Sequence, residues 1–478
     1  MELVYKVGDR PPIGKVIVFA LQQLLAILAA TIAVPAVINS SMPEGFIPMS
    51  QSAALFGAGA GTIVYLLFTK FKSPVFLGSS FAFLGSMATA FAGAATASLG
   101  YLGLIIGAAF AGLVYVIIAL VVKFAGVNWI NKIMPPVVIG PTVAIIGLSL
   151  AGNAIGDLMK GNVVKTQMLC SPYLALLCGL VTLAVTIVCS VYGKKTMKLI
   201  PFIIGIAAGY ALAAIFTGIG FAADVDALKI IDFSKFQNIE WYPKNFAFIN
   251  AFDGNYGNAN IGQYIGTIAV AYVPVAFVVF AEHIADHKNL SSVIGSDLLA
   301  EPGLQRTLLG DGIGSVAGAL FGGCPNTTYG ESVGCVAISG NASVITIFIT
   351  AIMAIISAFL APFTLFLASI PKCVMGGVCI ALYGFIAVSG LKMIQPVDLN
   401  DNRNLFVVSV VLIAGVGGLV LNIGPVTITS VACALILGIL CNVLVNVKSK
   451  KNKDNNEQLV IEEAAPVAEA VTEDKAEE

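Results

Sequence analysis

The chain has 478 residues, of which 58% are hydrophobic and 11% are charged, and its formal net charge is −1. Its mean hydropathy is +0.94. The charged fraction is less than half of that of an ordinary soluble domain, which excludes a soluble globular protein. Long stretches lack Asp, Glu, Lys and Arg altogether, and about 20 apolar residues span a bilayer as a helix. These stretches are residues 16–43, 73–122, 133–156, 166–193, 199–223, 254–281, 332–371 and 404–447.

In chain order, the apolar stretches divide into fourteen predicted membrane segments of an all-α polytopic protein. The first stretch is too long for the core of a signal peptide and no small-residue cleavage site follows it, so no cleavable leader is expected. The predicted segments lie near residues 16–38, 51–69, 76–91, 99–122, 133–151, 171–192, 198–217, 263–285, 307–321, 327–339, 343–370, 373–390, 404–421 and 425–447.

The basic residues predict the orientation of these segments. With both termini in the cytoplasm, most of the 25 basic residues fall on the inner side, as the positive-inside rule requires. An even number of crossings with both ends inside is therefore expected. The outer side then keeps Lys160, Lys165, Lys229, Lys235, Lys244 and Lys372.

The parts outside the segments are small. Residues 220–262 form the only sizeable outer loop, and residues 448–478 form a charged tail that we expect to be disordered. Neither part can hold a soluble catalytic domain, so an enzyme is not expected. The nine cysteines include no CxxC pair and are interpreted as packing residues, neither disulfide-bonded nor metal-binding.

Two of the segments are unsuited to a continuous helix. "FLGSSFAFLGS" (76–86) and "GGCPNTTYGESVG" (322–334) are rich in Gly, Ser, Thr and Pro, which weaken helices. Both contain two hydroxyl residues, an aromatic residue and a small residue in that order, at 79–82 and at 327–330. A second pair, "PVVIGPTVAIIG" from Pro136 and "PKCVMGGVCIALYG" from Pro371, is also alike. These pairs predict two halves of seven segments with opposite orientation.

Interrupted segments at matching places in two inverted halves indicate a transporter site near the middle of the membrane. Ordinary kinks at small residues are the alternative. Acidic side chains within the segments are few, and such residues are functional by default because they are costly there. Glu282 and Asp286 end the eighth segment, Asp311 lies in the ninth and Glu331 in the tenth. Carboxyl groups in such a site can accept N–H hydrogen bonds from a substrate and can load and release a proton.

Each of these groups also has a structural interpretation. Glu282 and Glu331 could instead form interhelical hydrogen bonds, and Asp311 could only cap a helix or bond locally. His283 and His287 lie on the stripe next to that of Glu282 and Asp286. Zinc needs a third and usually a fourth ligand, and the chain has no other histidine, so no metal site is expected. The histidines are expected where the helix leaves the membrane.

The motifs "AEHIADH", "NTTYGES", "YLLFTKFKSPVFLGSSFAF" and "GDRPPIGKVIVFALQQLLAILAATIAVP" resemble those of the nucleobase/cation symporter-2 family, also called nucleobase-ascorbate transporters. The bacterial uracil permease branch is the most similar. The resemblance runs from about residue 8 to residue 447, and the order of its motifs makes it specific. It implies a multi-pass protein of the cytoplasmic membrane that imports nucleobases with protons as the coupling ion. No cofactor and no nucleic-acid partner are expected. The expected partners are the lipid bilayer and a second copy of the chain in a homodimer.

The family fold implies a core of segments 1–4 and 8–11 and a gate of segments 5–7 and 12–14, with a short strand in segments 3 and 10. In this chain, that assigns residues 1–151 to core segments 1–4 and the start of the gate, 152–262 to gate segments 6–7 and the outer loop, and 263–370 to core segments 8–11. Residues 371–447 become gate segments 12–14, and residues 448–478 the cytoplasmic tail.

The resemblance also implies roles for residues. By position, Glu282 matches the family's main substrate carboxylate, Gly330 with Glu331 the second substrate-contacting pair, and Phe81 the aromatic residue packed against the base. The remaining candidates for substrate contact are Tyr329, Tyr383 and Ser80, and the candidates for proton coupling are Asp286 and Glu282.

Two departures from the uracil pattern keep a second substrate open. Asp286 stands where the uracil branch has its second histidine, as in the purine-transporting branch, and Ser332 stands where the motif often has asparagine. A purine such as xanthine is therefore the alternative to uracil. An anion exchanger or channel of a related fold is the alternative from another class, and the acidic groups in the predicted site count against it.

Overall fold

The computed structural model describes residues 3–446 except 127–134, 162, 165–166, 169, 195–196, 199, 237–244 and 424–425. The predicted tail at 448–478 lies outside the described residues, as do four of the lysines used to predict the orientation, namely Lys132, Lys165, Lys195 and Lys244.

Membrane-spanning helices make up most of the described chain. Eight helices in these residues are long and apolar enough to cross a membrane, and a ninth span results if the bent pair α15 and α16 counts as one. Two shorter apolar helices, α18 and α19, follow near the C-terminus. The chain is therefore a multi-pass helical membrane protein, and the full set of fourteen segments stays a prediction.

The first part of the chain forms α1 (Ile13–Ser41), α2 (Gln51–Phe68), β1 (Leu77–Ser79), α3 (Leu84–Ala92), α4 (Ala97–Ala125), α6 (Pro136–Ser149), α7 (Ala151–Leu158), β2 (Val163–Val164), β3 (Gln167–Met168), α8 (Pro172–Tyr192) and α10 (Pro201–Ala223). The outer loop holds two 3-10 turns, η1 (Asp226–Leu228) and η2 (Phe233–Phe236), and α11 (Ala247–Ala251).

The second part forms α12 (Ile261–Ile294), a π-helical turn η3 (Leu299–Gly303), α13 (Leu304–Gly322), β4 (Asn326–Thr328), α14 (Gly330–Ser339), α15 (Val344–Ser357), α16 (Ala361–Ser369), α17 (Lys372–Ile394), α18 (Asn402–Val416), β5 (Leu421–Ile423), β6 (Val426–Ile428) and α19 (Ser430–Asn446).

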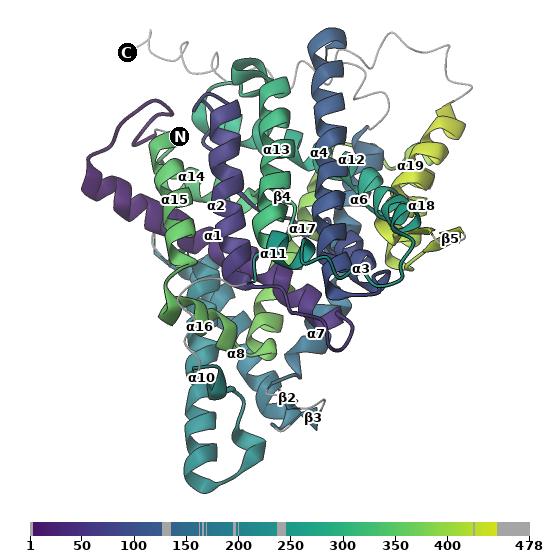
Figure 1. Ribbon diagram of the computed structural model, residues 1–478. Helices are drawn as coiled ribbons and strands as arrows, with labels where there is room; N and C mark the ends of the chain where they lie inside the picture. The colour runs from purple at the N-terminus through teal and green to yellow at the C-terminus, as the bar shows by residue number, and fades with distance from the viewer. Residues whose placement is uncertain are drawn as a thin grey trace, which may run out of the picture.

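One group of helices surrounds α13. In Figure 1, α2, α13 and α4 run side by side through the middle of the molecule, and α12 packs against α4 and α15 against α2. Glycines let α2 and α13 approach closely: a Cβ atom on Gly57 would lie 2.5 Å from the carbonyl oxygen of Gly318, and one on Gly61 would lie 2.6 Å from that of Gly314. Small residues at such contacts are typical of helix packing in membranes.

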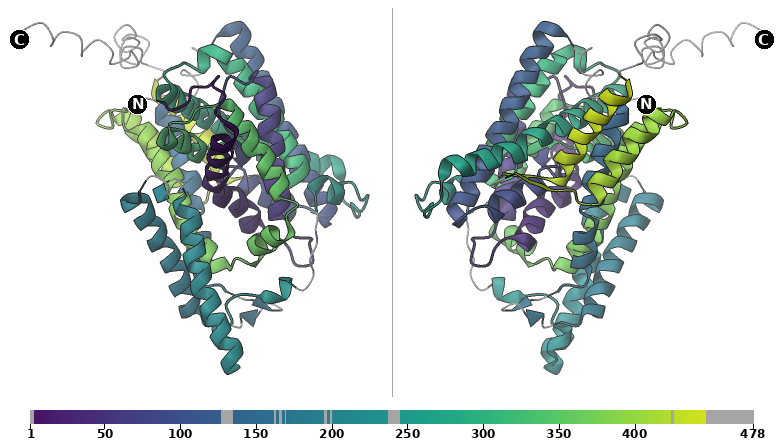
Figure 2. Two further views of the ribbon diagram at one scale, coloured as in Figure 1. Left: turned by 90° about the vertical axis from the view of Figure 1, so that its left-hand side faces the viewer. Right: turned by 90° about the vertical axis from the view of Figure 1, so that its right-hand side faces the viewer.

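A second group of helices surrounds α17. Helix α17 packs against α6, α7 and α8. Helix α8 also packs against α10, and α18 packs against α6 and α19. The pair α8 and α10 extends beyond the other helices at the end of the molecule away from the N-terminus (Figures 1 and 2). Helices α6 and α17 carry the two similar proline-led sequences, so the structure brings this pair of motifs together.

The two interrupted segments meet as short antiparallel strands. Each segment forms a three-residue strand followed by a short helix, β1 before α3 and β4 before α14. In the register of the pair, Leu77 faces Thr328 and Ser79 faces Asn326. The short strands expected in these two segments are therefore present. They place the start of α14 beside α12, which α14 contacts.

Two predicted segments differ from the structure. The segment expected at 343–370 is broken into α15 and α16, which are bent by 81°. Pro362 stands in the first turn of α16, where proline is tolerated, and proline cannot continue a preceding helix. The segment expected to end at residue 285 continues to Ile294, where Gly295 ends the helix in a left-handed conformation with φ of 66°. The pairs β2–β3 and β5–β6 were not predicted.

Candidate functional site

Three of the four predicted acidic residues meet at a cavity of about 370 Å³ between the two helix groups. Glu282 and Asp286 come from α12, and Gly330 and Glu331 come from the start of α14. The opposite wall consists of residues from α10 and α17, including Phe202 and Phe385. Four residues that lie up to 49 positions apart in the chain thus line one space, as the sequence predicted. Their roles in binding stay a prediction.

The spacing of Glu282 and Asp286 places them on one face of α12. Residues i and i+4 of a helix lie one above the other, and both of these side chains are partly exposed to the cavity. Asp286 is held from the far side by Thr328 of β4, whose hydroxyl donates a hydrogen bond of 2.6 Å to Asp286 Oδ2. The strand crossing therefore fixes one carboxyl group of the cavity.

The N-terminus of α14 supplies hydrogen-bond donors at the same place. Gly330 and Glu331 are its first two residues, and the first N–H groups of a helix have no partner within the helix. They carry the positive end of the helix dipole, which favours an electronegative group of a ligand. The cavity therefore offers carboxylate acceptors from α12 and α14 together with N–H donors from α14. This set suits a small planar molecule with both N–H and C=O groups.

Two predicted aromatic residues, Phe81 and Tyr383, contact each other and do not line this cavity. The rings of Phe81 and Tyr383 lie 5.7 Å apart, centroid to centroid, in an edge-to-face arrangement. A second cavity of about 490 Å³ lies between the end of α1, the start of α2 and the start of α17, and it shares no lining residue with the first. On α17, Tyr383 stands between Cys379, which lines the second cavity, and Phe385, which lines the first. Tyr383 therefore lies between the two cavities along α17, and the predicted contact of Phe81 and Tyr383 with a substrate stays a prediction.

Tyr329 and Ser80 are buried beside the cavity and do not line it. The Tyr329 hydroxyl donates a hydrogen bond of 2.7 Å to the carbonyl oxygen of Ser79. The backbone amide of Ser80 donates one of 2.9 Å to the carbonyl oxygen of Pro325. Both residues thus brace the crossing of the two interrupted segments, and their predicted contact with a substrate stays a prediction.

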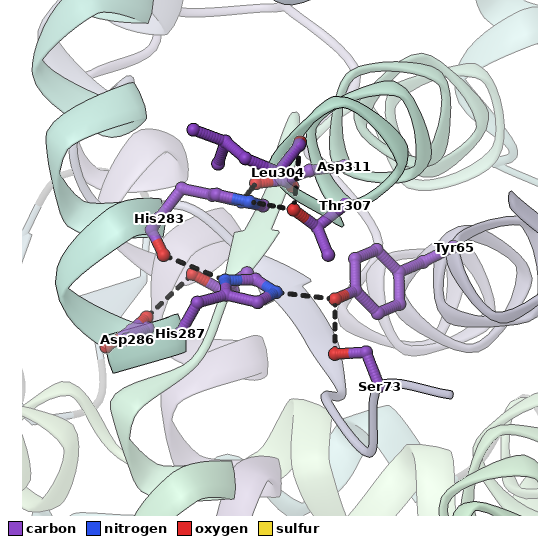
Figure 3. A network of polar contacts seen from close by, with 9 residues as sticks. Tyr65, Ser73, His283, Asp286, His287, Leu304, Thr307 and Asp311 are labelled. Atoms are coloured by element: carbon purple, nitrogen blue, oxygen red, sulfur yellow. Dashed lines mark hydrogen bonds and ion pairs between the residues drawn. The ribbon is translucent and has the colours of Figure 1, made fainter. Parts of the chain in front are cut away.

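The two histidines were expected at the interface where the helix leaves the membrane, whereas the structure buries both. His283 and His287 are 0% exposed and face the interior of the first helix group (Figure 3). His283 Nδ1 lies 2.7 Å from Asp311 Oδ2, and His283 Nε2 lies 3.0 Å from the Thr307 hydroxyl. Because α12 continues for seven residues past His287, this stripe lies well inside the helix.

Asp311 has a long-range partner. Its carboxyl group bonds to His283, which is 28 positions away, so the alternative of a cap or a local bond is wrong. Asp311 is also 0% exposed. It does not line the cavity with Glu282 and Asp286, although all three lie close enough to interact electrostatically.

Sequence reasoning missed two polar residues near the site. Gln23 of α1 donates a hydrogen bond of 2.6 Å to the Ser332 hydroxyl of α14, and this hydroxyl also accepts one of 3.2 Å from the backbone amide of Phe76. The signal for Gln23 was an amide within the apolar run "FALQQLLAIL". Lys198 lines the cavity as an exposed cation, and nothing in the sequence separates it from the neighbouring loop lysines. Within the described residues, no three of His, Cys, Asp and Glu lie close enough to hold a metal ion.

Comparison with known proteins adds a family to this geometry. Residues 14–424 match the sequence profile of the Permease family of xanthine and uracil permeases. The chain is 39% identical over 445 residues to a uracil permease of Bacillus caldolyticus, which covers 92% of this chain and 94% of the relative. It is 36% identical over 460 residues to a uracil permease of Bacillus subtilis, covering 95% and 97%. Among solved structures, the murine anion transporter Slc26a9 has a TM-score of 0.62 at 12% identity, covering 92% of this chain and 69% of that one. That likeness concerns the fold alone.

Proposed function

Because the chain belongs to the Permease family, which is the nucleobase/cation symporter-2 family that its motifs resemble, we propose that it imports uracil with protons by alternating access. The membrane is the cytoplasmic membrane, with both termini inside, and the proposed assembly is a homodimer. The names of the relatives support uracil as the substrate.

One observation carries the proposal: carboxyl groups from α12 and α14 and the N-terminus of α14 line the same cavity. Uracil is a flat ring with two N–H donors and two carbonyl acceptors. Glu282 and Glu331 can accept the two N–H groups, and the backbone N–H group of Gly330, at the first position of α14, can donate to a carbonyl. Small-molecule sites combine such a few polar groups with apolar walls, which Phe202 and Phe385 supply here. Phe81 and Tyr383 close the site on the other side.

Asp286 and Glu282 are the proposed proton carriers. Asp286 borders the cavity one helical turn from Glu282, so its charge acts directly on the proposed substrate carboxylate. In the proposal, protonation of both groups favours the state that binds uracil, and release of the proton to the inside lowers the affinity there. The hydrogen bond from Thr328 keeps Asp286 in place in both steps.

Alternating access follows from the two separate cavities. The site cavity reaches the exposed Lys198, which the positive-inside rule places on the cytoplasmic side. The other cavity includes Lys372, predicted to be outside. In the proposal, this arrangement is the inward-facing state of the cycle. The first helix group acts as the core and the second as the gate, within fourteen segments in two inverted halves, and outward opening parts Phe81 from Tyr383.

Uptake by the purified full chain in proteoliposomes tests the function. An inwardly directed pH gradient is expected to drive uptake of radiolabelled uracil, and unlabelled uracil is expected to compete better than xanthine, thymine or guanine. Stronger competition by xanthine would overturn the substrate assignment in favour of a purine. Currents carried by inorganic anions without uracil would support an anion exchanger or channel and contradict the proposal.

A further inference from the structure

The packed face of α12 carries a buried proton-sharing pair that the proposed transport function does not use. His283 of α12 contacts two side chains of α13 through its two ring nitrogens, Asp311 through Nδ1 at 2.7 Å and Thr307 through Nε2 at 3.0 Å (Figure 3). All three residues are 0% exposed. The contacts tie the stripe next to Glu282 and Asp286 to the helix at the centre of the first group.

Counting donors fixes where the protons of the pair lie. The Thr307 hydroxyl donates its one proton to the carbonyl oxygen of Leu304 at 3.0 Å. Its oxygen must therefore accept from His283, so the Nε2 atom of His283 carries a proton. A single further proton lies between His283 Nδ1 and Asp311 Oδ2. On Nδ1 it makes an ion pair, and on Oδ2 it leaves a neutral histidine and a neutral acid.

The surroundings favour the neutral arrangement. Among the described residues, no donor reaches Asp311 Oδ1, and an ionised carboxylate that lacks partners in a dry interior is costly. The ring of His287 stacks on that of His283 at 4.0 Å between centroids, which opposes a positive charge on His283. Glu282 and Asp286 interact electrostatically with Asp311 and oppose a negative charge there.

The remaining polar neighbours of the pair are two tyrosines, a serine and His287. Tyr115 of α4 lies 6.4 Å from His283 between ring centroids. The hydroxyl of Tyr65 on α2 lies 2.7 Å from His287 Nε2 and 2.7 Å from the hydroxyl of Ser73. His287 Nδ1 in turn donates to the carbonyl oxygen of His283 at 2.8 Å. None of the hydrogen bonds in this network involves a lysine or an arginine.

The pair is also closed off from the cavity. Neither His283 nor Asp311 lines it, and the chain of contacts through His287 and Tyr65 ends at Ser73, which is itself buried. His283 and Asp311 both belong to the helix group proposed to move as one body. Within the described residues, no side-chain hydrogen bond joins the pair to the cavity, whereas Glu282 and Asp286 line it.

We propose that His283 and Asp311 are positioning residues that share one retained proton, with Asp311 donating it to His283, and that this proton stays on the pair throughout the transport cycle. The pair fixes the rotation of α12 against α13 and so holds Glu282 and Asp286 toward the cavity. The inference rests on the proposed function only for the role of those two carboxyl groups.

Two variants at one position test the role. In Asp311→Asn, the side-chain amide can donate to His283 Nδ1 as the protonated acid does, but it cannot titrate. We expect this variant to keep the uracil KM and the pH profile of uptake. In Asp311→Leu, which is matched in size but has no donor, we expect the KM to rise by about tenfold or more while the pH midpoint of uptake stays unchanged. Loss of pH-gradient-driven uptake in Asp311→Asn with uracil binding intact would overturn the proposal, because the pair would then carry the coupling proton.

An infrared difference spectrum of wild type minus Asp311→Asn tests the proton without using transport. We expect the C=O stretch of a protonated carboxylic acid at neutral pH, unchanged by uracil and by raising the pH to the limit at which the protein stays folded. A carboxylate band in its place would overturn the neutral pair. Should Asp311→Asn not fold, the same band is sought in the wild type by comparison with Asp311→Leu. Failure of the wild type to transport uracil would contradict the proposed function and leave this spectrum unaffected.

Discussion

Two faces of α12 each carry a pair of ionisable side chains, and the surroundings of the two pairs differ. Glu282 and Asp286 border a cavity of about 370 Å³ on one face. His283 follows Glu282 in the sequence, and His287 follows Asp286. Both histidines are fully enclosed by α13, α2 and α4. Both pairs have the spacing i and i+4. In the proposed function, access to the cavity therefore separates the pair that exchanges protons from the pair that holds the helix in place.

The largest expected effect is that of Glu282→Gln on the cavity face. The amide keeps the size of the side chain, but it cannot exchange a proton, and its NH2 group cannot accept a hydrogen bond from a uracil N–H group. A buried donor left without its acceptor costs about 1–3 kcal/mol. We expect uracil affinity, measured by isothermal titration calorimetry, to fall by about 10- to 100-fold. Wild-type affinity in this variant would show that Glu282 does not bind the substrate.

Asp286→Asn is expected to separate binding from coupling. Uracil binding should persist, since Glu282 and Glu331 remain, whereas uptake should lose its dependence on the pH gradient. Counterflow of uracil in proteoliposomes without a gradient measures the first property, and gradient-driven uptake measures the second. Unchanged gradient-driven uptake would remove Asp286 from the coupling mechanism.

Two threonines allow a matched comparison of the faces. Thr328 donates a hydrogen bond to Asp286 on the cavity face, and Thr307 accepts one from His283 on the packed face. We expect Thr328→Val to change the pH midpoint of uptake. We expect Thr307→Val to lower the free energy of unfolding by about 1–3 kcal/mol, since it leaves a buried N–H group unpaired, with the pH midpoint unchanged.

The reverse pattern, a shifted midpoint in Thr307→Val and an unshifted one in Thr328→Val, would assign proton exchange to the packed face. Uptake as a function of pH, together with thermal melting in detergent, distinguishes the two patterns.

The smallest expected effect lies outside the membrane segments. Glu301 forms an exposed ion pair with Lys72, and this lysine lowers the pKa of the Glu301 carboxyl group below its ordinary value. A lowered pKa stabilises the fold at pH values above the ordinary pKa of glutamate, and this contribution is lost as the pH falls through the lowered value. Exposed pairs are strongly screened. We expect Glu301→Gln to leave melting and uptake unchanged at neutral pH, and a clear loss of uptake there would give this loop a role in transport.

Much of the fold could be predicted because its causes are local. Apolar runs give the spanning helices, and Gly, Ser, Thr and Pro give the two interruptions that form β1 and β4. The errors arose where tertiary contacts decide. The polar residues from Glu282 onward seemed to end the eighth segment, yet α12 continues to Ile294 because His283 and His287 find buried partners.

The site could be predicted in part for the same reason. Spacing put Glu282 and Asp286 on one stripe, and the broken segment placed Glu331 at a helix start. No spacing reveals that His283 meets Asp311, because that contact depends on how α12 is rotated against α13. Likewise, the separation of Phe81 and Tyr383 from the cavity lining depends on the relative position of the two helix groups.

A structure of the protein with uracil would test the central claim most directly. The account predicts density for one planar ring in the cavity between Glu282 and Glu331, with the N–H groups of the ring directed at the two carboxyl groups. Density for uracil only in the other cavity, or a ring in the site that contacts neither Glu282 nor Glu331, would contradict it.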